Sequence, residues 1–168
     1  MCSVVHRCFV DYGNNGDVWR LTRFYGPLET SRREETWTLL ESLSQVSDVS
    51  WQCIGDFNEI TKASENKRDN VRPMRQMNRF RSVINLCVFH DLGFHGVAFT
   101  WFKNNSDESR LKICSDQALG TNAWRQKFKE ATLHHIPTSA SDHSMLSLRL
   151  VGTDQQTVKN KFWFEAML

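Results

Sequence analysis

The sequence contains no apolar run long enough to cross a membrane and no CxxC pair. A transmembrane helix needs roughly 18 or more apolar residues, and the N-terminus lacks a basic segment followed by an apolar run. The five cysteines are odd in number and widely spaced, which is typical of reduced core thiols. We therefore expect a soluble intracellular protein, nuclear or cytoplasmic, with no zinc site and no membrane partner.

The formal net charge is also small, at only +2. Such a balance does not indicate a nucleic-acid partner, although basic residues gather at Arg32–Arg33, Lys67–Arg68 and Arg72–Arg81. Taken singly, each group is typical of a solvated face. The 168 residues are 40% hydrophobic and 11% aromatic, which is enough for the core of one domain.

Two stretches rich in β-branched and aromatic residues, Ser3–Tyr12 and Asp17–Tyr25, predict a hairpin. The residues between them, Gly13–Gly16, tolerate the positive φ of a tight turn. Further strands are predicted near Trp51, and then at Val97–Phe102, Leu111–Leu119, Thr132–Ile136 and Met145–Leu150.

Two amphipathic helices are expected between these strands. Ser31 and Glu34 match a capping box at the start of a helix over residues 31–46. A second helix is predicted to start at Pro73 and to end by Gly93. The polar segment 61–73 between them predicts a mobile loop, and Thr121–Phe128 predicts a short helix.

The most informative stretch is Trp51–Glu59, an apolar run that stops at Gly55 and is followed by two polar side chains. Alternation along a strand sends Asp56 and Asn58 to one side and Phe57 to the other. A carboxylate and an amide there are suited to orienting a water and contacting a phosphate. A strand end at which the two side chains cap local amides is the alternative interpretation.

Other candidate residues also lie at strand ends. Tyr25 precedes a glycine and a proline, and Asp116 lies in the stretch Leu111–Leu119. Asp142 and His143 precede the final strand, where a histidine beside an aspartate suits acid–base chemistry or phosphate binding. Taken alone, Tyr25 is more typical of a core residue with a satisfied hydroxyl, and each of the other signals is weak by itself.

The ordered set of motifs resembles the endonuclease/exonuclease/phosphatase (DNase I-like) superfamily. These motifs are Phe24–Gly26, Gly55–Glu59, Ser115–Leu119 and Ser141–His143. The supporting stretches, among them Trp19–Thr22 and Phe99–Trp101, are similar to the endonuclease domain of plant non-LTR (LINE-type) retrotransposons. Residues 1–150 are then the endonuclease domain, and residues 151–168 resemble the link to a reverse transcriptase.

This resemblance implies a four-layered α/β sandwich and a phosphodiesterase site that uses Mg²⁺ or Mn²⁺ on DNA. It assigns Asp56 and Asn58 to orienting water and phosphate, and Tyr25 to donating to a phosphate oxygen. It pairs Asp116 with His143 and gives Asp142 to the metal or the leaving group. The implied partners are DNA and a reverse transcriptase domain in the parent polyprotein.

The chain also departs from that family pattern. The family's first strands carry an Asn and a metal-binding Glu, whereas residues 1–28 contain no Glu, and Ser115 and Gln117 replace the usual Leu and Arg. We therefore expect a truncated domain with an open sheet edge, weak metal binding and impaired or lost catalysis. Two alternatives are an active enzyme whose metal is held by Asp56, Asp142 and Glu59, and a non-catalytic nucleic-acid-binding remnant that uses Arg72–Arg81 and Phe99–Trp101.

Overall fold

The computed structural model describes residues 4–12, 17–46, 48–67, 72–104, 110–150 and 161–165. The helices are α1 (Arg33–Ser44), α2 (Met74–Leu86) and α3 (Asn122–Lys127), with short 3-10 helices η1 (Thr30–Arg32) and η2 (Ala63–Glu65). The strands are β1 (Val4–Tyr12), β2 (Asp17–Tyr25), β3 (Trp51–Asp56), β4 (Asn66–Lys67), β5 (Phe89–Asp91), β6 (His95–Gly96), β7 (Trp101–Asn104), β8 (Arg110–Ile113), β9 (Asp116–Thr121), β10 (Thr132–Ile136), β11 (Met145–Arg149) and β12 (Lys161–Glu165).

The main sheet has the strand order β12-β1-β2-β3-β9-β5. β1 and β2 pair antiparallel over their whole length, which confirms the predicted hairpin, while its turn residues 13–16 lie outside the described part. β2 and β3 run parallel and are joined through α1. Their common direction brings the ends of two candidate strands to one edge of the sheet.

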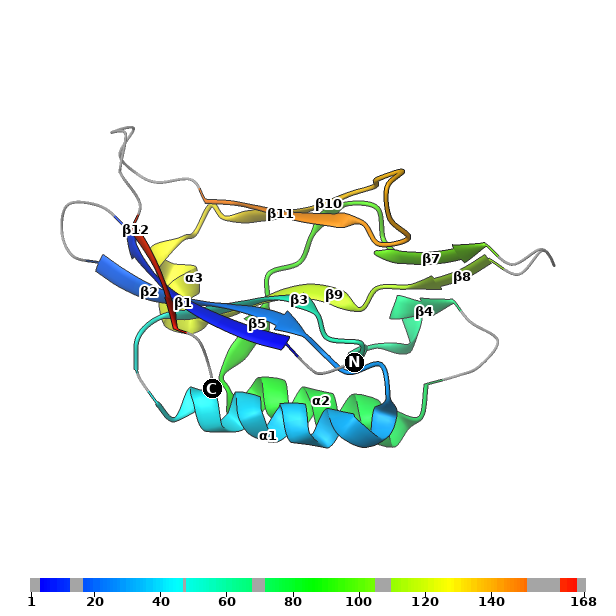
Figure 1. Ribbon diagram of the computed structural model, residues 1–168, viewed down its shortest axis with the longest axis horizontal. Coiled ribbons are helices and arrows are strands. Elements are labelled where there is room, and N and C mark those ends of the chain that lie inside the picture. Colours follow the sequence, from blue (N-terminus) through cyan, green and yellow to red (C-terminus); the bar gives the residue numbers. More distant parts are fainter. Residues whose placement is uncertain are drawn as a thin grey trace.

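Helices α1 and α2 lie side by side on one face of this sheet (Figure 1). Phe57, Phe80 and Trp37 from three segments are buried there, with ring centroids 4.8 Å apart for Trp37 and Phe80 and 5.4 Å apart for Phe57 and Phe80. Burying such aromatic rings removes much apolar surface from water and fixes the helices on the sheet.

A three-stranded sheet, β11-β10-β6, lies across the opposite face of the main sheet (Figure 1). Helix α3 fills the space between the sheets, where Trp124 and Phe128 pack on Trp19 of β2 and on Leu148 of β11. A second three-stranded sheet, β4-β8-β7, stands at the end of the molecule. The mixed α/β fold class with facing sheets is confirmed.

Both predicted helices differ in detail from the observed ones. α1 begins at Arg33 after the η1 turn, and its N-cap Arg32 makes no side-chain cap, so the Ser31–Glu34 capping box is wrong. α2 begins after Pro73 as expected but ends at Leu86, because Val88 takes a φ of 54°. Phe89–Asp91 then pairs with β9 as strand β5, so Gly93 does not end the helix.

Two predicted strands are also divided or shortened. The stretch Leu111–Leu119 splits into β8 and β9, which belong to different sheets. The Val97–Phe102 stretch contributes only its last residues to β7. In the segment 61–73, residues 63–67 form η2 and β4 instead of an irregular loop, and residues 68–71 lie outside the described part.

The edge of the N-terminal hairpin is paired. Strand β12 runs antiparallel to β1, with Arg7 opposite Glu165 and Asp11 opposite Lys161. The open edge that we expected beside β1 is therefore moved outward by one strand, because β12 pairs with β1 and is itself the last strand of the described sheet.

Three cysteines are free and buried, Cys53, Cys87 and Cys114. Burial raises the pKa of Cys87 to about 11 and that of Cys114 to about 12, so both stay protonated thiols at neutral pH. None of the helices in the described ranges has the length and apolar character needed to cross a bilayer.

Candidate functional site

The site is built on the end of β3, where Gly55 allows an unusually close approach of β2. Gly55 has a φ of 145°, and a Cβ placed on it would lie 1.9 Å from the carbonyl oxygen of Phe24. Only glycine fits there. Phe57, which follows the strand, is fully buried and stacks on Phe24 with ring centroids 4.6 Å apart. This packing fixes Asp56 at the strand end between two rigid anchors.

Asp56 lies directly opposite Asp116 in the β3–β9 register. Burial raises the pKa of the Asp56 carboxyl, and the nearby negative charge of Asp116 raises it further. Hydrogen bonds from the Asn58 backbone and from Ser115 act in the opposite direction. Two buried carboxylates facing each other form a strongly negative point that favours a proton or a cation.

His143 supplies the positive partner of this pair. Its Nδ1 lies 3.2 Å from Oδ2 of Asp116, and the hydrogen bond to Asp116 raises the pKa of the imidazole. A backbone bridge between Trp101 and His143 holds the segment in place. His143 is therefore biased toward the imidazolium form, with one-third of its side chain exposed.

Asn58 joins the site through a local turn and not through strand alternation. β3 ends at Asp56, and Asn58 adopts a φ of 51°. Its backbone N–H donates to Oδ1 of Asp56 at 2.8 Å, and its Nδ2 donates to the carbonyl of Gly26 at 2.8 Å. The hydrogen bonds by which Asn58 caps local groups are thus the ones that hold it at the site. The side-chain amide of Asn58 keeps one hydrogen that can be donated to a ligand.

Tyr25 and Asp142 complete the set of sequence-predicted residues. Tyr25 is paired with Asp56 in the β2–β3 register and lines the same pocket as Asn58. Asp142 is exposed at that pocket, and its Oδ2 accepts a hydrogen bond from Nε1 of Trp101 at 2.9 Å.

These side chains surround one cavity of about 520 Å³. Its lining consists of Tyr25, Leu28, Thr30, Arg33, Asn58, Arg72, Trp101, Ile113, Ser115, Asp142 and His143. The Asp56–Asp116 pair adjoins this cavity through Asn58, Ser115 and His143. All six sequence-predicted residues are therefore brought to one end of the sheets.

Sequence reasoning missed the arginine side of the pocket. Arg33 donates from Nη1 to Oε2 of Glu59 at 2.8 Å, and Nε of Arg72 lies 3.2 Å from Oε1 of the same carboxylate. Glu59 is only 1% exposed, and its negative charge is neutralised by the ion pairs with the two arginines. Assigning Glu59 as a metal ligand is therefore wrong. The pair spans 26 residues, so no local charge pattern predicts it.

Among the described residues, one group has the geometry of a metal site. One oxygen each from Asp56 and Asp116 and one nitrogen of His143 lie within 4.8 Å of one another. Two carboxylates suit a hard divalent cation, which completes its shell with water and substrate phosphate. Burial and then the negative charge of Asp116 raise the pKa of Asp56, and a cation beside the two carboxylates would offset both effects. The two carboxylates fit a divalent cation, whereas His143, as an imidazolium hydrogen-bonded to Asp116, is not a ligand.

The fold is that of the DNase I-like endonuclease/exonuclease/phosphatase proteins. No protein-family model matches the sequence, and no curated protein matches it. The similarity is therefore one of three-dimensional structure.

Three solved structures illustrate it. The endonuclease domain of TRAS1, a telomere-specific non-LTR retrotransposon, aligns with a TM-score of 0.60 at 14% identity, over 92% of this chain and 70% of that one. A Neisseria 3′ phosphatase, NExo, bound to a product DNA hairpin, aligns with a TM-score of 0.62 at 15% identity, over 79% of this chain and 61% of that one. The catalytic domain of Xenopus laevis APE2 aligns with a TM-score of 0.54 at 16% identity, over 91% of this chain and 57% of that one. The chain spans less than two-thirds of the latter two structures.

Proposed function

We propose that this chain is a metal-dependent phosphodiesterase domain that acts on DNA. The observation that carries the proposal is the convergence of Asp56, Asp116 and His143 beside a cavity that Tyr25 and Asn58 also line. These groups come from separate strands and loops, and they combine negative and positive side chains around a space suited to a phosphate. The fold shared with DNA-processing proteins supports the same substrate class.

The residues divide the chemistry of in-line attack on a phosphodiester between them. The Asp56 carboxylate, held by the backbone N–H of Asn58, orients the attacking water and accepts its proton. Asn58 is held by Gly26 and uses its remaining amide hydrogen to orient the water or a phosphate oxygen. Tyr25 and the His143 imidazolium donate hydrogen bonds to the phosphate as its negative charge grows. Asp116 keeps His143 oriented and charged.

A divalent cation, Mg²⁺ or Mn²⁺, would be held by the carboxylates of Asp56 and Asp116, and when bound it would neutralise charge on the phosphate. Asp142 is the ligand that the family resemblance assigns, and it lies at the pocket without belonging to the close group. Because Glu59 is paired with arginines, no third carboxylate joins the group within the described residues. We therefore propose weak cation binding and slow catalysis.

A supercoiled-plasmid nicking assay in Mg²⁺ or Mn²⁺ tests the activity. We expect slow nicking by the wild-type chain and none by Asp56→Ala or His143→Ala. Nicking that persists in both variants would place the activity elsewhere. Cleavage as fast as that of typical enzymes of 1–10³ turnovers per second would contradict the weak-cation part.

A non-catalytic nucleic-acid-binding role is the second candidate. The Nζ atoms of Lys67 and Lys112 lie 5.4 and 6.0 Å from the ring centroid of Phe99, near the pocket residue Trp101. A positively flanked aromatic ring suits a nucleic-acid strand. This role predicts salt-sensitive DNA retention without cleavage.

We further propose that the domain derives from a non-LTR retrotransposon and works beside a reverse transcriptase domain of its parent polyprotein. The sequence resemblance and the similarity to the TRAS1 endonuclease domain support this. Reading the full-length transcript tests it, since we expect reverse transcriptase motifs in the same frame.

A further inference from the structure

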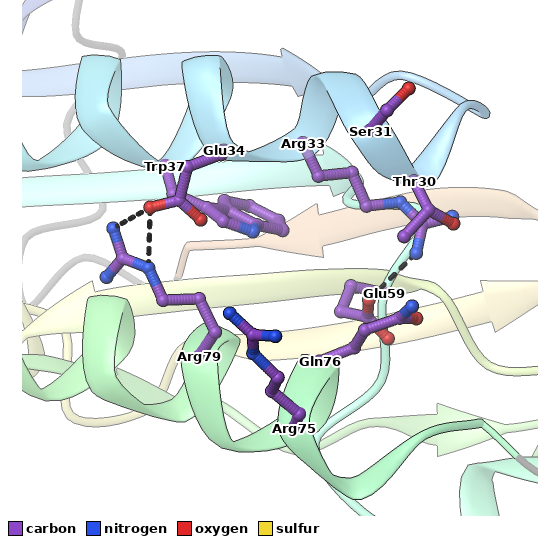
Figure 2. A pocket seen from close by; sticks show the side chains of 9 residues that line it. All are labelled: Thr30, Ser31, Arg33, Glu34, Trp37, Glu59, Arg75, Gln76 and Arg79. Carbon is purple, nitrogen blue, oxygen red and sulfur yellow. Dashed lines mark hydrogen bonds and ion pairs between the residues drawn. The ribbon is translucent and has the colours of Figure 1, made fainter.

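A second cavity, of about 560 Å³, lies between α1 and α2 (Figure 2). Its lining comes from η1, the start of α1, the segment after β3 and the facing turns of α2. It consists of Thr30, Ser31, Arg33, Glu34, Trp37, Glu59, Arg75, Gln76 and Arg79. Thr30 and Arg33 also line the candidate active-site pocket. The two cavities therefore adjoin along the Thr30–Arg33 turn.

Some of the charged side chains that the structure describes around this cavity form ion pairs, and one does not. Arg79 donates to Glu34 and Glu41 at 2.6–2.8 Å, and Arg33 is paired with Glu59. Arg75 extends from α2 into the space between the helices (Figure 2). Within the described part of the chain, no acidic side chain pairs with its guanidinium, so the cavity keeps one uncompensated positive charge.

Polar groups beside Arg75 are also available for a ligand. The side-chain oxygen of Gln76 is buried without a hydrogen-bond partner among the described residues. Rotation of this amide presents its NH₂ group to an acceptor. Ser31 and Thr30 add hydroxyl groups to the lining, and Thr30 also lines the candidate active-site pocket. A guanidinium, an amide and two hydroxyls form a donor set suited to phosphate oxygens.

We propose that the α1–α2 cavity binds a backbone phosphate of the DNA strand whose neighbouring phosphate occupies the candidate active site. This inference rests on the proposed function, because it needs a strand running through the first pocket. Arg75 then fixes the direction of the strand over the Thr30–Arg33 turn. Arg33, already held by Glu59, forms the boundary between the two phosphate positions.

Binding of a short fluorescein-labelled duplex, measured by anisotropy in EDTA, tests the proposal without cleavage. We expect Arg75→Gln to weaken binding about three- to tenfold and to reduce the slope of log K against log salt by about 0.9, the value for one phosphate contact. Arg149→Gln is the matched control, because Arg149 is an exposed arginine on β11, across the sheets from α1 and α2. Ser31→Asp places a negative charge in the same cavity and should also weaken binding.

Equal effects of Arg75→Gln and Arg149→Gln, or no DNA binding by the wild-type chain, would overturn the inference. The nicking assay separates this result from the fate of the proposed function. A chain that never cleaves but still shows the Arg75 effect keeps the phosphate site and loses the enzymatic role. A chain that cleaves but shows no Arg75 effect keeps the enzymatic role alone.

Discussion

His143 and Asp116 are 27 residues apart in the sequence, yet Nδ1 of the histidine lies 3.2 Å from Oδ2 of the aspartate. Asp116 begins β9, and His143 lies in the turn before β11, so two different sheets meet at this contact. The contact sets the imidazole beside the Asp56–Asp116 pair and ties the final strand to the candidate site.

The first prediction concerns the cation. Asp116→Asn should lower Mn²⁺ affinity by at least about tenfold, because even partners one shell away from a metal are worth that much. Asp142→Asn should have a smaller effect, because Asp142 is outside the close group. Electron paramagnetic resonance of free Mn²⁺ measures both affinities. A larger loss of Mn²⁺ affinity in Asp142→Asn than in Asp116→Asn would show that Asp142 is the main metal ligand, as the family resemblance implies.

The second prediction concerns the buried carboxylate of Glu59. Glu59→Gln leaves Arg33, which is 5% exposed, without its ion-pair partner, and should lower the free energy of unfolding by about 3–5 kcal/mol. Urea unfolding measures the change. Glu35→Gln on the exposed face of α1 is the control and should change stability by less than about 0.5 kcal/mol. Similar small effects of both substitutions would show that the Arg33–Glu59 ion pair does not stabilise the fold.

The third prediction concerns the close approach of β2 and β3. Gly55→Ala places a methyl group against the Phe24 carbonyl at a φ that alanine rarely adopts, and should prevent folding to a soluble chain. Gly93→Ala is the comparison, since its φ is also positive but nothing lies within 4 Å of the added atom. It should cost only about 1–2 kcal/mol. Soluble expression and urea unfolding distinguish them, and a stable Gly55→Ala protein would contradict this geometry.

The fourth prediction concerns pH. Burial lowers the pKa of His135, whose Nδ1 contacts the carbonyl of Val97 at 3.1 Å. As pH falls, the unfolded chain takes up this proton first, so unfolding is favoured. The contribution to stability is complete above the ordinary pKa of about 6.5 and is lost as pH falls below it. Urea midpoints should drop over this range more in the wild type than in His135→Gln, and identical pH profiles would exclude this role.

The structure brings the six candidate residues together at one end of the sheets, whereas several of the elements that carry them differ from the prediction. Asp56, Asn58 and Tyr25 follow from short motifs at strand ends, which remain recognisable when packing changes. The division of Leu111–Leu119 depends on which sheet each half joins, and Cys114 bonds through its backbone to Glu65, far away in sequence. The early end of α2 at Val88 likewise depends on β5 pairing with β9.

The arginine side of the site could not be predicted for a related reason. Arg33 and Arg72 belong to basic groups that are typical of a solvated surface, and only the fold brings them to Glu59. The Trp101–Asp142 hydrogen bond spans 41 residues and is equally invisible to local patterns.

Single-turnover cleavage of a duplex oligonucleotide, measured for the wild type, Asp116→Asn, His143→Ala and the double variant, tests the central claim most directly. If the pair acts as one unit on a phosphodiester, each single variant should lose about 10²–10⁴-fold in rate, and the double variant should lose little more. Losses that multiply, or a wild-type rate no faster than that of His143→Ala, would contradict a phosphodiesterase site built on this contact.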